Sequence, residues 1–398
     1  MLSVMPKLLI LPAYPGALGG TTVSLALLLR GLLEIQAIDR VQVVVQSGSV
    51  LEHYLQAQGL TEGLVPIAAE TPRQFLHAAL QWVNRQPWDC PLLLETCVSA
   101  DLLAVLALAT PVLRLSGRPV YHFFHDLARS HNPWSNLLRR LTFRSFSSRA
   151  LCNSLFTAKH IQEWGLNICG VLYQPVDLEQ FQPHSCNPPP ELVSILATGA
   201  RLILTPSRIS KPGDMNDKNL RAIAPVLAEL KAMGEHYHAV IIGQDFSRDR
   251  SRSRDLQLQA EGLGVGDRFT ILPPTFAIAE YYHHADLVLA LAPREPFGRT
   301  VIEAIACGVP VIGSETGGIG EVLSQFAPQW MVDPANPEET AQKIRQIQLD
   351  PNTNKILADG KRWVEKHCQP KDYALKTLSI IEPSIAIPNK KPLSLEVP

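Results

Sequence analysis

The stretch 286–312 constrains the fold most, because it places two buried strands on either side of one short helix. An apolar run over 286–292 ends at a proline, as expected of a strand that is buried on both faces of a parallel sheet. Residues 301–307 are compatible with a helix, Gly308 is placed to end it, and 309–312 start another buried strand. This order predicts an α/β sheet whose loop after 292 lies at the carboxyl ends of the strands, where ligands bind.

Length and composition narrow the class of protein. A chain of 398 residues is too long for one hydrophobic core, so two domains are expected. A formal net charge of -1 gives no field that would attract nucleic acid, and we expect no nucleic-acid partner. The seven cysteines are scattered and never spaced as Cys-x-x-Cys, which fits a reducing cytosol without a structural zinc.

The sequence shows neither a signal peptide nor a membrane span. The first residues lack a basic region followed by an apolar segment and a cleavage site. The longest uncharged apolar run, 102–113, contains Pro111 and is shorter than the roughly eighteen residues that span a bilayer. We therefore expect a cytoplasmic protein, soluble or at most peripheral at the inner face of the membrane.

Two glutamates mark the loop and the helix of the 286–312 stretch. Glu295 and Glu303 are separated by seven residues that include Phe297 and Gly298. This spacing resembles the Glu-x7-Glu signature of retaining glycosyltransferases of family 4, the glycosyl transferases group 1, which have the GT-B fold. Downstream, 314–321 resembles the Gly-Gly-x-x-Glu turn of the same family. The combination is more specific than a pair of glutamates, which many surface helices carry.

The resemblance implies a GT-B fold, in which two Rossmann-like α/β domains face each other across a cleft. On this basis 1–182 would bind the acceptor and 201–355 would bind a nucleotide-sugar, with a proline-rich linker at 183–200. A C-terminal helix at 356–382 would cross back to the first domain. The remaining residues, 383–398, are rich in proline and are expected to be disordered.

Two motifs in the first domain are candidate site elements. Gly19 and Gly20 stand between a short strand, 7–11, and an apolar helix, an arrangement that offers backbone N–H groups to a phosphate. Glycines alone more often form a turn, but the family carries a Gly-Gly loop here that approaches the donor diphosphate and the acceptor. His125 follows the strand 119–124 and resembles the family histidine that faces the donor sugar.

The segment 132–148 predicts an amphipathic helix in which apolar residues alternate with Arg139, Arg140 and Arg144. A basic amphipathic helix can lie on an anionic membrane. A helix that packs its apolar face into the core and exposes its basic face is the simpler interpretation, and we favour it. Residues 150–154 resemble the last strand of the first domain.

In the second domain, Arg208 follows the strand 201–205 and Lys218 stands where the next helix begins. They resemble an Arg and Lys pair of the family, whose two cations would stabilise the charge on a departing diphosphate. The loop between them is longer than in the common pattern, which leaves Lys211 as an alternative to Lys218. We favour Lys218 because of its place at the helix start. Gly243 ends another buried strand at the same edge.

The resemblance implies a role for each candidate residue. Glu303 would accept hydrogen bonds from the ribose hydroxyls, and Glu295 would hold the donor sugar together with the backbone around Phe297 and Gly298. The start of the helix would offer N–H groups to the diphosphate, from Arg299, Thr300 and Val301. Since the cations can replace a metal and no Asp-x-Asp motif ends a strand, we expect metal-independent chemistry and no cofactor besides the nucleotide-sugar.

The function implied by the resemblance is retaining transfer of a sugar from a nucleotide-diphosphate sugar to an acceptor in polysaccharide assembly. The acceptor would be a saccharide, a lipid-linked saccharide or a small molecule. Two alternatives remain: a nucleotide-sugar epimerase of the same fold, and a catalytically silent nucleotide-sugar-binding subunit. The sequence does not name the sugar, the base or the acceptor.

Overall fold

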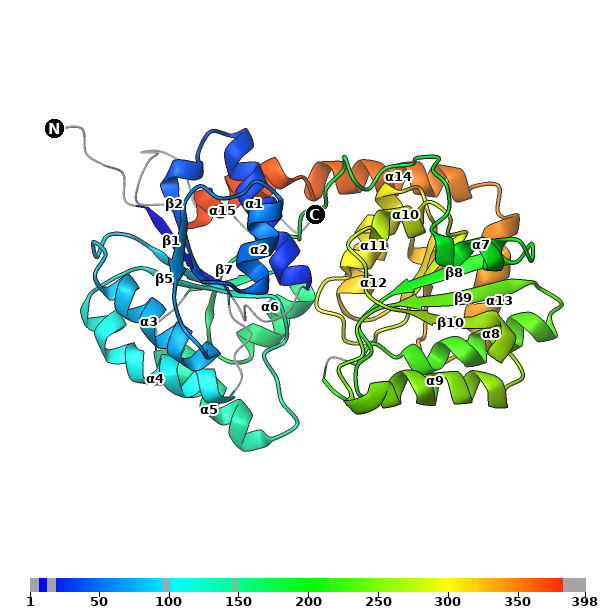
Figure 1. Cartoon of the computed structure of the whole chain (residues 1–398), viewed down its shortest axis with the longest axis horizontal. Helices are drawn as coiled ribbons and strands as arrows, with labels where there is room; N and C mark the ends of the chain where they lie inside the picture. Colours follow the sequence, from blue (N-terminus) through cyan, green and yellow to red (C-terminus); the bar gives the residue numbers. More distant parts are fainter. Residues whose placement is uncertain (1–6, 13–18, 96–99, 146–148, 216, 382–398) are drawn as a thin grey trace.

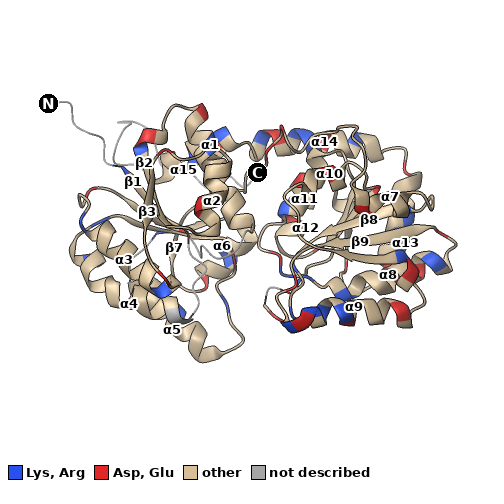
Figure 2. Ribbon diagram, viewed as in Figure 1, with Lys and Arg blue, Asp and Glu red and all other residues tan. Residues whose placement is uncertain are grey.

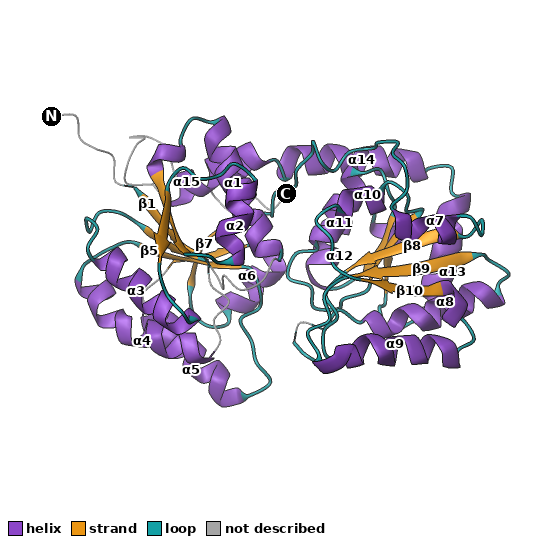
Figure 3. Ribbon diagram, in the orientation of Figure 1, coloured by secondary structure: helices purple, strands orange, loops and turns teal. Residues whose placement is uncertain are grey.

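A computed structural model describes residues 7–12, 19–95, 100–145, 149–215 and 217–381. These residues form two α/β domains that lie side by side, each built on a parallel sheet with helices on both faces (Figures 1 and 3). The prediction of two Rossmann-like domains is therefore confirmed.

The sheet of the first domain has, within the described residues, the strand order β3-β2-β1-β4-β5-β6-β7. Its central strands are buried along their whole length, because helices cover both faces. The strands are β1 (Leu8–Leu11), β2 (Val41–Gln46), β3 (Leu64–Ile67), β4 (Leu92–Leu94), β5 (Val120–Phe124), β6 (Arg149–Cys152) and β7 (Asn167–Val171).

The prediction that 150–154 form the last strand of this domain is wrong, because β7 pairs with β6 beyond it. β7 is an edge strand that begins with an exposed asparagine and contains Gly170, so its sequence lacks a strong apolar pattern. Sequence analysis also missed the edge strand β3, which is short and only half-buried.

The helices of the first domain begin at residues with clear local signals. Thr71 and Gln74 form a capping box at the start of one helix, and the side chains of Ser49 and Ser154 cap two others. The helices are α1 (Gly20–Glu34), α2 (Val50–Ala57), α3 (Pro72–Asn84), α4 (Ala100–Leu115), α5 (Pro133–Ser145) and α6 (Leu155–Gln162).

The sheet of the second domain has, within the described residues, the strand order β10-β9-β8-β11-β12-β13. The order reverses between β8 and β11, and such a switch point leaves a crevice at the carboxyl ends of the strands. The strands are β8 (Arg201–Pro206), β9 (Tyr237–Ile242), β10 (Phe269–Leu272), β11 (Leu287–Ala290), β12 (Val311–Ser314) and β13 (Met331–Val332).

The helices around this sheet are α7 (Pro190–Leu196), α8 (Ile223–Ala232), α9 (Ser251–Gly262), α10 (Ile278–Tyr282), α11 (Arg299–Ala306), α12 (Gly317–Leu323) and α13 (Pro337–Leu349). The segment 183–200, which we expected as a linker, contains α7. Leu192 and Ile195 of this helix pack into the core of the second domain. The glycine pair at 317–318 begins α12, so the expected turn continues as a helix.

The C-terminal segment crosses from the second domain to the first, as expected (Figure 1). It forms two helices, α14 (Thr353–His367) and α15 (Pro370–Ile381), because a proline interrupts the helical pattern. Gly360 of α14 packs against Phe326 of the second domain. Tyr373 and Leu378 of α15 belong to a core cluster of the first domain. The last helix therefore completes the domain that the first residues begin.

Candidate active site between the domains

The loop 293–298 follows β11 and lies at the switch point beside β8. Gly298 precedes α11 and adopts a φ of 97°, and a Cβ at this position would lie 3.0 Å from Ile319 Cγ1. The amide of Gly318 donates to the Glu295 carbonyl at 2.7 Å. A Cβ on Gly318 would come within 2.4 Å of the Phe297 Cα, so only glycine allows this approach. The two predicted motifs thus interlock as neighbouring loops, and each fixes the shape of the other.

Lys218 and Glu295 meet as an ion pair between the loops that follow β8 and β11. Both side chains are about one fifth exposed, at 19% and 20%. The Lys218 amide donates to Ser210 Oγ at 3.0 Å, and the next residue, Asn219, adopts a left-handed conformation with a φ of 53°. The Asn219 side chain donates to the Leu291 carbonyl at 3.2 Å, which ties the two loops together.

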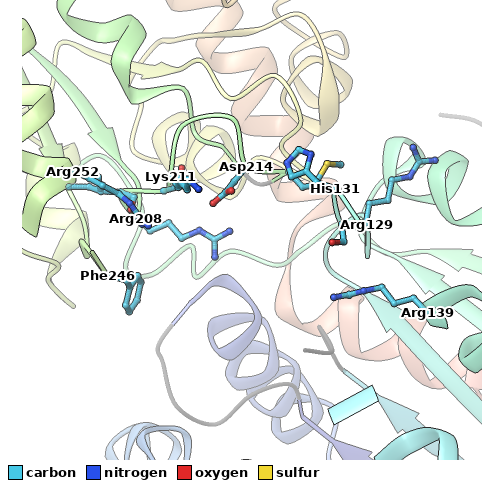
Figure 4. Close-up of a pocket in the computed structure, with 12 residues that line it drawn as sticks. Arg129, His131, Arg139, Arg208, Lys211, Asp214, Phe246 and Arg252 are labelled. Atoms are coloured by element: carbon cyan, nitrogen blue, oxygen red, sulfur yellow. The ribbon is translucent and has the colours of Figure 1, made fainter. Parts of the chain in front are cut away.

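Arg208 and Lys211 line a cavity of about 380 Å³ between the two domains (Figure 4). Both residues are exposed, and neither forms an ion pair with any residue that the structure describes. Gly243 lies beneath this loop, where a Cβ would fall 1.9 Å from the Ser207 carbonyl oxygen. Gly243 therefore shapes the loop that carries Arg208.

Glu303 is buried on α11, with 8% of the residue exposed, and accepts a hydrogen bond from the Tyr282 hydroxyl at 2.9 Å. Burial raises the pKa of this carboxyl, although the nearby Arg299 and the Tyr282 hydroxyl act in the opposite direction. Phe297 and Val301 are also buried, so their side chains belong to the core. The Val301 amide already donates to the Gly298 carbonyl at 3.0 Å. Thr300 is half-buried.

Arg299 links the second domain to the glycine loop of the first. Its guanidinium donates to the Pro175 carbonyl at 2.8 Å and to the Gly20 carbonyl at 3.3 Å, and it also contacts Ser24 Oγ. The start of α1 thus meets the start of α11. Gly19 precedes α1 and is exposed, and the loop before it lies outside the described residues.

His125 directly follows β5 and so lies at the carboxyl end of this strand. Its ring lies against Phe123, with centroids 4.1 Å apart, and its Nδ1 is 3.4 Å from Gln174 Nε2. Burial lowers the pKa of His125 to about 3, and repulsion from Arg299 and His122 adds to this shift. His122 points to the opposite face and stacks on Phe124, as a core residue does.

Residues 199–363 match the family model described as glycosyl transferases group 1. We call this part of the second domain, which matches the model, the group 1 domain. The match runs from just before β8 into α14 and thus includes each second-domain site residue described above.

Curated relatives support the same assignment of the group 1 domain. The D-inositol 3-phosphate glycosyltransferase of Geodermatophilus obscurus is 26% identical over 244 residues, which are 58% of this chain and 54% of that protein. The D-inositol 3-phosphate glycosyltransferase of Rhodococcus opacus is 31% identical over 144 residues, 36% of this chain and 32% of the relative. The chain spans about half the length of the first of these relatives, and about a third of the second.

Solved structures resemble the whole chain. Anabaena Alr3699/HepE in complex with UDP has a TM-score of 0.74 at 18% identity, covering 94% of this chain and 98% of that one. Sucrose-phosphate synthase from Thermosynechococcus elongatus has a TM-score of 0.68 at 17% identity, with coverages of 94% and 98%. The group 1 domain and the domain before it therefore form the expected GT-B fold.

Sequence analysis missed a buried carboxyl beside His125. Glu95 follows β4, and its Oε1 lies 3.9 Å from His125 Nε2, with side-chain exposures of 2% and 5%. Burial raises the pKa of Glu95 to about 8. Neither of these two atoms, nor the Tyr373 hydroxyl, has a hydrogen-bond partner within the described residues. An acid directly after an apolar strand was the available signal.

The pKa of Glu95 predicts a pH-dependent effect of the change Glu95→Gln. The pKa of Glu95 is raised from 4.5 to about 8 in the folded protein, so Glu95 loses its proton at a lower pH in the unfolded chain than in the folded one. The stability of the wild type therefore falls as pH rises through this interval. Glutamine stays neutral, so we expect the variant to gain about 1 kcal/mol or more relative to wild type between pH 5 and pH 8. Urea unfolding at both values measures this difference.

His125 acts in the opposite direction, since its lowered pKa removes stability as pH falls below about 6.5, but this contribution is common to both proteins. Glu338→Gln, which changes an exposed glutamate on α13, is the control and should show no pH-dependent difference. If the free energy of unfolding of Glu95→Gln differs from that of the wild type by the same amount at pH 5 and pH 8, the expected titration is contradicted.

The group 1 domain also contacts the first domain directly through Glu321. Its two carboxylate oxygens accept the backbone N–H groups of Leu155 and Phe156, both at 2.8 Å, at the start of α6. A carboxylate at a helix N-terminus is favourable for both hydrogen bonding and the helix dipole. The Ser154 hydroxyl donates to the Pro296 carbonyl in the neighbouring loop. The loop that carries Glu295 therefore lies against the first domain.

Proposed function

We propose that this protein is a retaining glycosyltransferase that moves a sugar from a nucleotide-diphosphate sugar to an acceptor without a metal ion. One observation carries the proposal. Glu295 and Lys218 form an ion pair on loops from two adjacent strands of the group 1 domain, and Arg208 and Glu303 lie on the same loops or the helix that follows. The carboxylates and cations therefore come from neighbouring loops and one helix at the same edge of the group 1 sheet.

The residues can divide the reaction among them. Glu303 offers a carboxylate to the ribose hydroxyls, and Glu295 offers one to the donor sugar. As the glycosidic bond breaks, the sugar passes through an oxocarbenium-like state and negative charge develops on the diphosphate. Arg208 and Lys218, with Lys211 at the cavity wall, supply positive charge that can stabilise this leaving group in place of a metal.

The relatives suggest which substrates to test first. The Anabaena protein was solved with UDP and with UDP-glucose, so we propose UDP as the first donor nucleotide. The names of the curated relatives include D-inositol 3-phosphate, so we propose small phosphorylated acceptors as the first choice beside saccharides and lipid-linked saccharides.

A thermal-shift series with UDP, GDP, ADP and dTDP tests the donor site. A nucleotide at about 100 times its Kd stabilises the folded state by about 2.7 kcal/mol, which gives a shift of several degrees. We expect one nucleotide to produce this shift, Glu303→Gln to reduce it, and Glu338→Gln to leave it unchanged. If none of the four nucleotides raises the melting temperature of the wild type, the assigned donor site is wrong.

Incubation with a labelled nucleotide-sugar separates the proposed reaction from its alternatives. Label in an acceptor product, with the anomeric configuration retained, supports the transferase. Conversion of the donor to an isomer without acceptor would instead support the epimerase. Binding without either product would support the silent subunit.

We further propose that the protein contacts the membrane from the cytoplasmic side through α4 and α5. Our prediction that α5 packs its apolar face into the core is wrong: within its described residues only Thr142 and Phe143 are buried. The Trp134 side chain is 79% exposed. Other large apolar residues on the two helices are also exposed, namely Leu108, Val112, Leu115, Leu137, Leu138 and Leu141.

The charges near this apolar surface fit an anionic bilayer. α5 contains three arginines and no acidic residue, and α4 carries few charges whereas α9 carries many (Figure 2). Aromatic and aliphatic side chains beside arginines are typical of helices that lie in the membrane interface. None of the helices in the described part of the chain is long and apolar enough to span a bilayer.

Vesicle sedimentation tests this contact. We expect the wild type to bind vesicles that contain phosphatidylglycerol more strongly than pure phosphatidylcholine vesicles, with less binding at high salt. Trp134→Ser should weaken binding several-fold, because it removes a large apolar side chain from the interface. Trp88→Ser is the matched control, since Trp88 is 65% exposed but precedes β4 rather than lying on these helices. An equal loss of vesicle binding in both variants would rule out a specific role for α5.

A further inference from the structure

The cavity between the domains has cations on both walls. Arg208, Lys211 and Arg252 line it from the group 1 domain, and Arg129 and Arg139 line it from the first domain (Figure 4). The proposed chemistry needs cations on the group 1 side, where the donor diphosphate would lie. It does not account for the cations on the opposite wall.

Arg139 and Arg208 point toward one another across this cavity (Figure 4). Neither guanidinium forms an ion pair with a residue in the described part of the chain. Arg139 makes one long hydrogen bond, from Nε to Ser135 Oγ at 3.4 Å. By contrast, Arg129 is paired with Glu163 and its guanidinium is directed away from the cavity in Figure 4. Two facing positive charges repel each other unless an anion lies between them.

The chain around Arg139 is held in a fixed conformation. The Asn136 side chain accepts from the Ser130 amide and donates to the Ser130 carbonyl, both at 2.7 Å. Asn132 Oδ1 accepts from the Trp134 amide at 2.9 Å and so caps the start of α5. Arg139 therefore projects from a helix whose first turn is fixed to the preceding loop, which favours a binding role.

We propose that Arg139 is a phosphate-binding residue, which grips one phosphate group between the domains together with Arg208. A guanidinium presents N–H groups in a planar fork that matches two phosphate oxygens. The phosphate belongs either to the donor diphosphate or to a phosphorylated acceptor. This inference deepens the proposed function and rests on it for the placement of the donor.

Calorimetric titration of the full chain at low ionic strength tests the inference and separates the two sources. UDP, GDP, ADP and dTDP are titrated first, and inorganic phosphate is then titrated into the nucleotide-saturated protein. Arg139→Gln is compared with wild type and with Arg140→Gln, which changes an exposed arginine on the same helix that does not line the cavity. Unchanged melting temperatures show that both variants fold.

We expect Arg139→Gln to weaken one of the two titrations about tenfold or more, and Arg140→Gln to match wild type. Weaker nucleotide binding assigns the phosphate to the donor. Unchanged nucleotide binding together with weaker binding of inorganic phosphate assigns the phosphate group to the acceptor.

If wild type binds a nucleotide and Arg139→Gln changes neither titration, the inference is overturned while the donor site stands. If no nucleotide binds but phosphate binds in an Arg139-dependent manner, the donor assignment fails and the phosphate site remains. Binding of neither ligand overturns both.

Discussion

Lys218→Met is expected to lower kcat for sugar transfer by about 100-fold or more, the usual effect of removing a charged group that stabilises the transition state. The substitution removes the cation that pairs with Glu295 and leaves this carboxylate without its partner at the crevice. The loss should appear mainly in kcat, because the interaction matters most when the diphosphate departs. Initial rates with a labelled donor over a range of donor concentrations measure it.

Lys211→Met is the matched comparison, because Lys211 lies on the same loop, lines the cavity and has no ion-pair partner among the residues that the structure describes. We expect a smaller loss, dominated by KM for the donor. A larger fall in kcat for Lys211→Met than for Lys218→Met would reverse the assignment and make Lys211 the phosphate lysine.

Gly243→Ala is expected to destabilise the protein by about 3 kcal/mol and to weaken nucleotide binding. The new Cβ would lie 1.9 Å from the Ser207 carbonyl oxygen and 3.0 Å from the Arg208 amide nitrogen. Both atoms belong to the backbone, so the loop after β8 must move, and Arg208 moves with it. Urea unfolding and nucleotide titration measure the two effects.

The control is Gly262→Ala at the end of α9, where a Cβ would meet no atom within 4 Å. Its stability should stay within about 1 kcal/mol of wild type, because alanine favours the helix. If Gly243→Ala is as stable as this control, the close approach of the two loops does not constrain position 243.

The local architecture of the site could be predicted from the sequence, because its elements have strong patterns. The apolar run before Glu295, the glycine at 298 and the helix that carries Glu303 are contiguous, and each was placed within a few residues. The edge strands β3 and β7 were missed because half-buried strands have weak patterns.

Other features depend on contacts between distant segments, which one sequence does not specify. Glu95 meets His125 only because β4 and β5 are neighbours in the sheet. The hydrogen bonds from the start of α6 to Glu321 connect residues that are separated by 166 and 165 positions in the sequence. The apolar face of α5 has the same periodicity whether a core or solvent lies against it, so its exposure could not be predicted from the pattern.

The return of α15 to the first domain has a consequence for the order of events on the ribosome. Its residues Tyr373, Ala374, Leu378 and Ile381 complete a core cluster with β1 and α1, which are made first. The group 1 domain is nearly contiguous in the chain and can fold while synthesis continues. The first domain cannot complete its core, and keeps an apolar face exposed, until almost the whole chain has been synthesised. A nascent chain that stops before Pro370 should therefore hold a folded second domain beside a protease-sensitive first one.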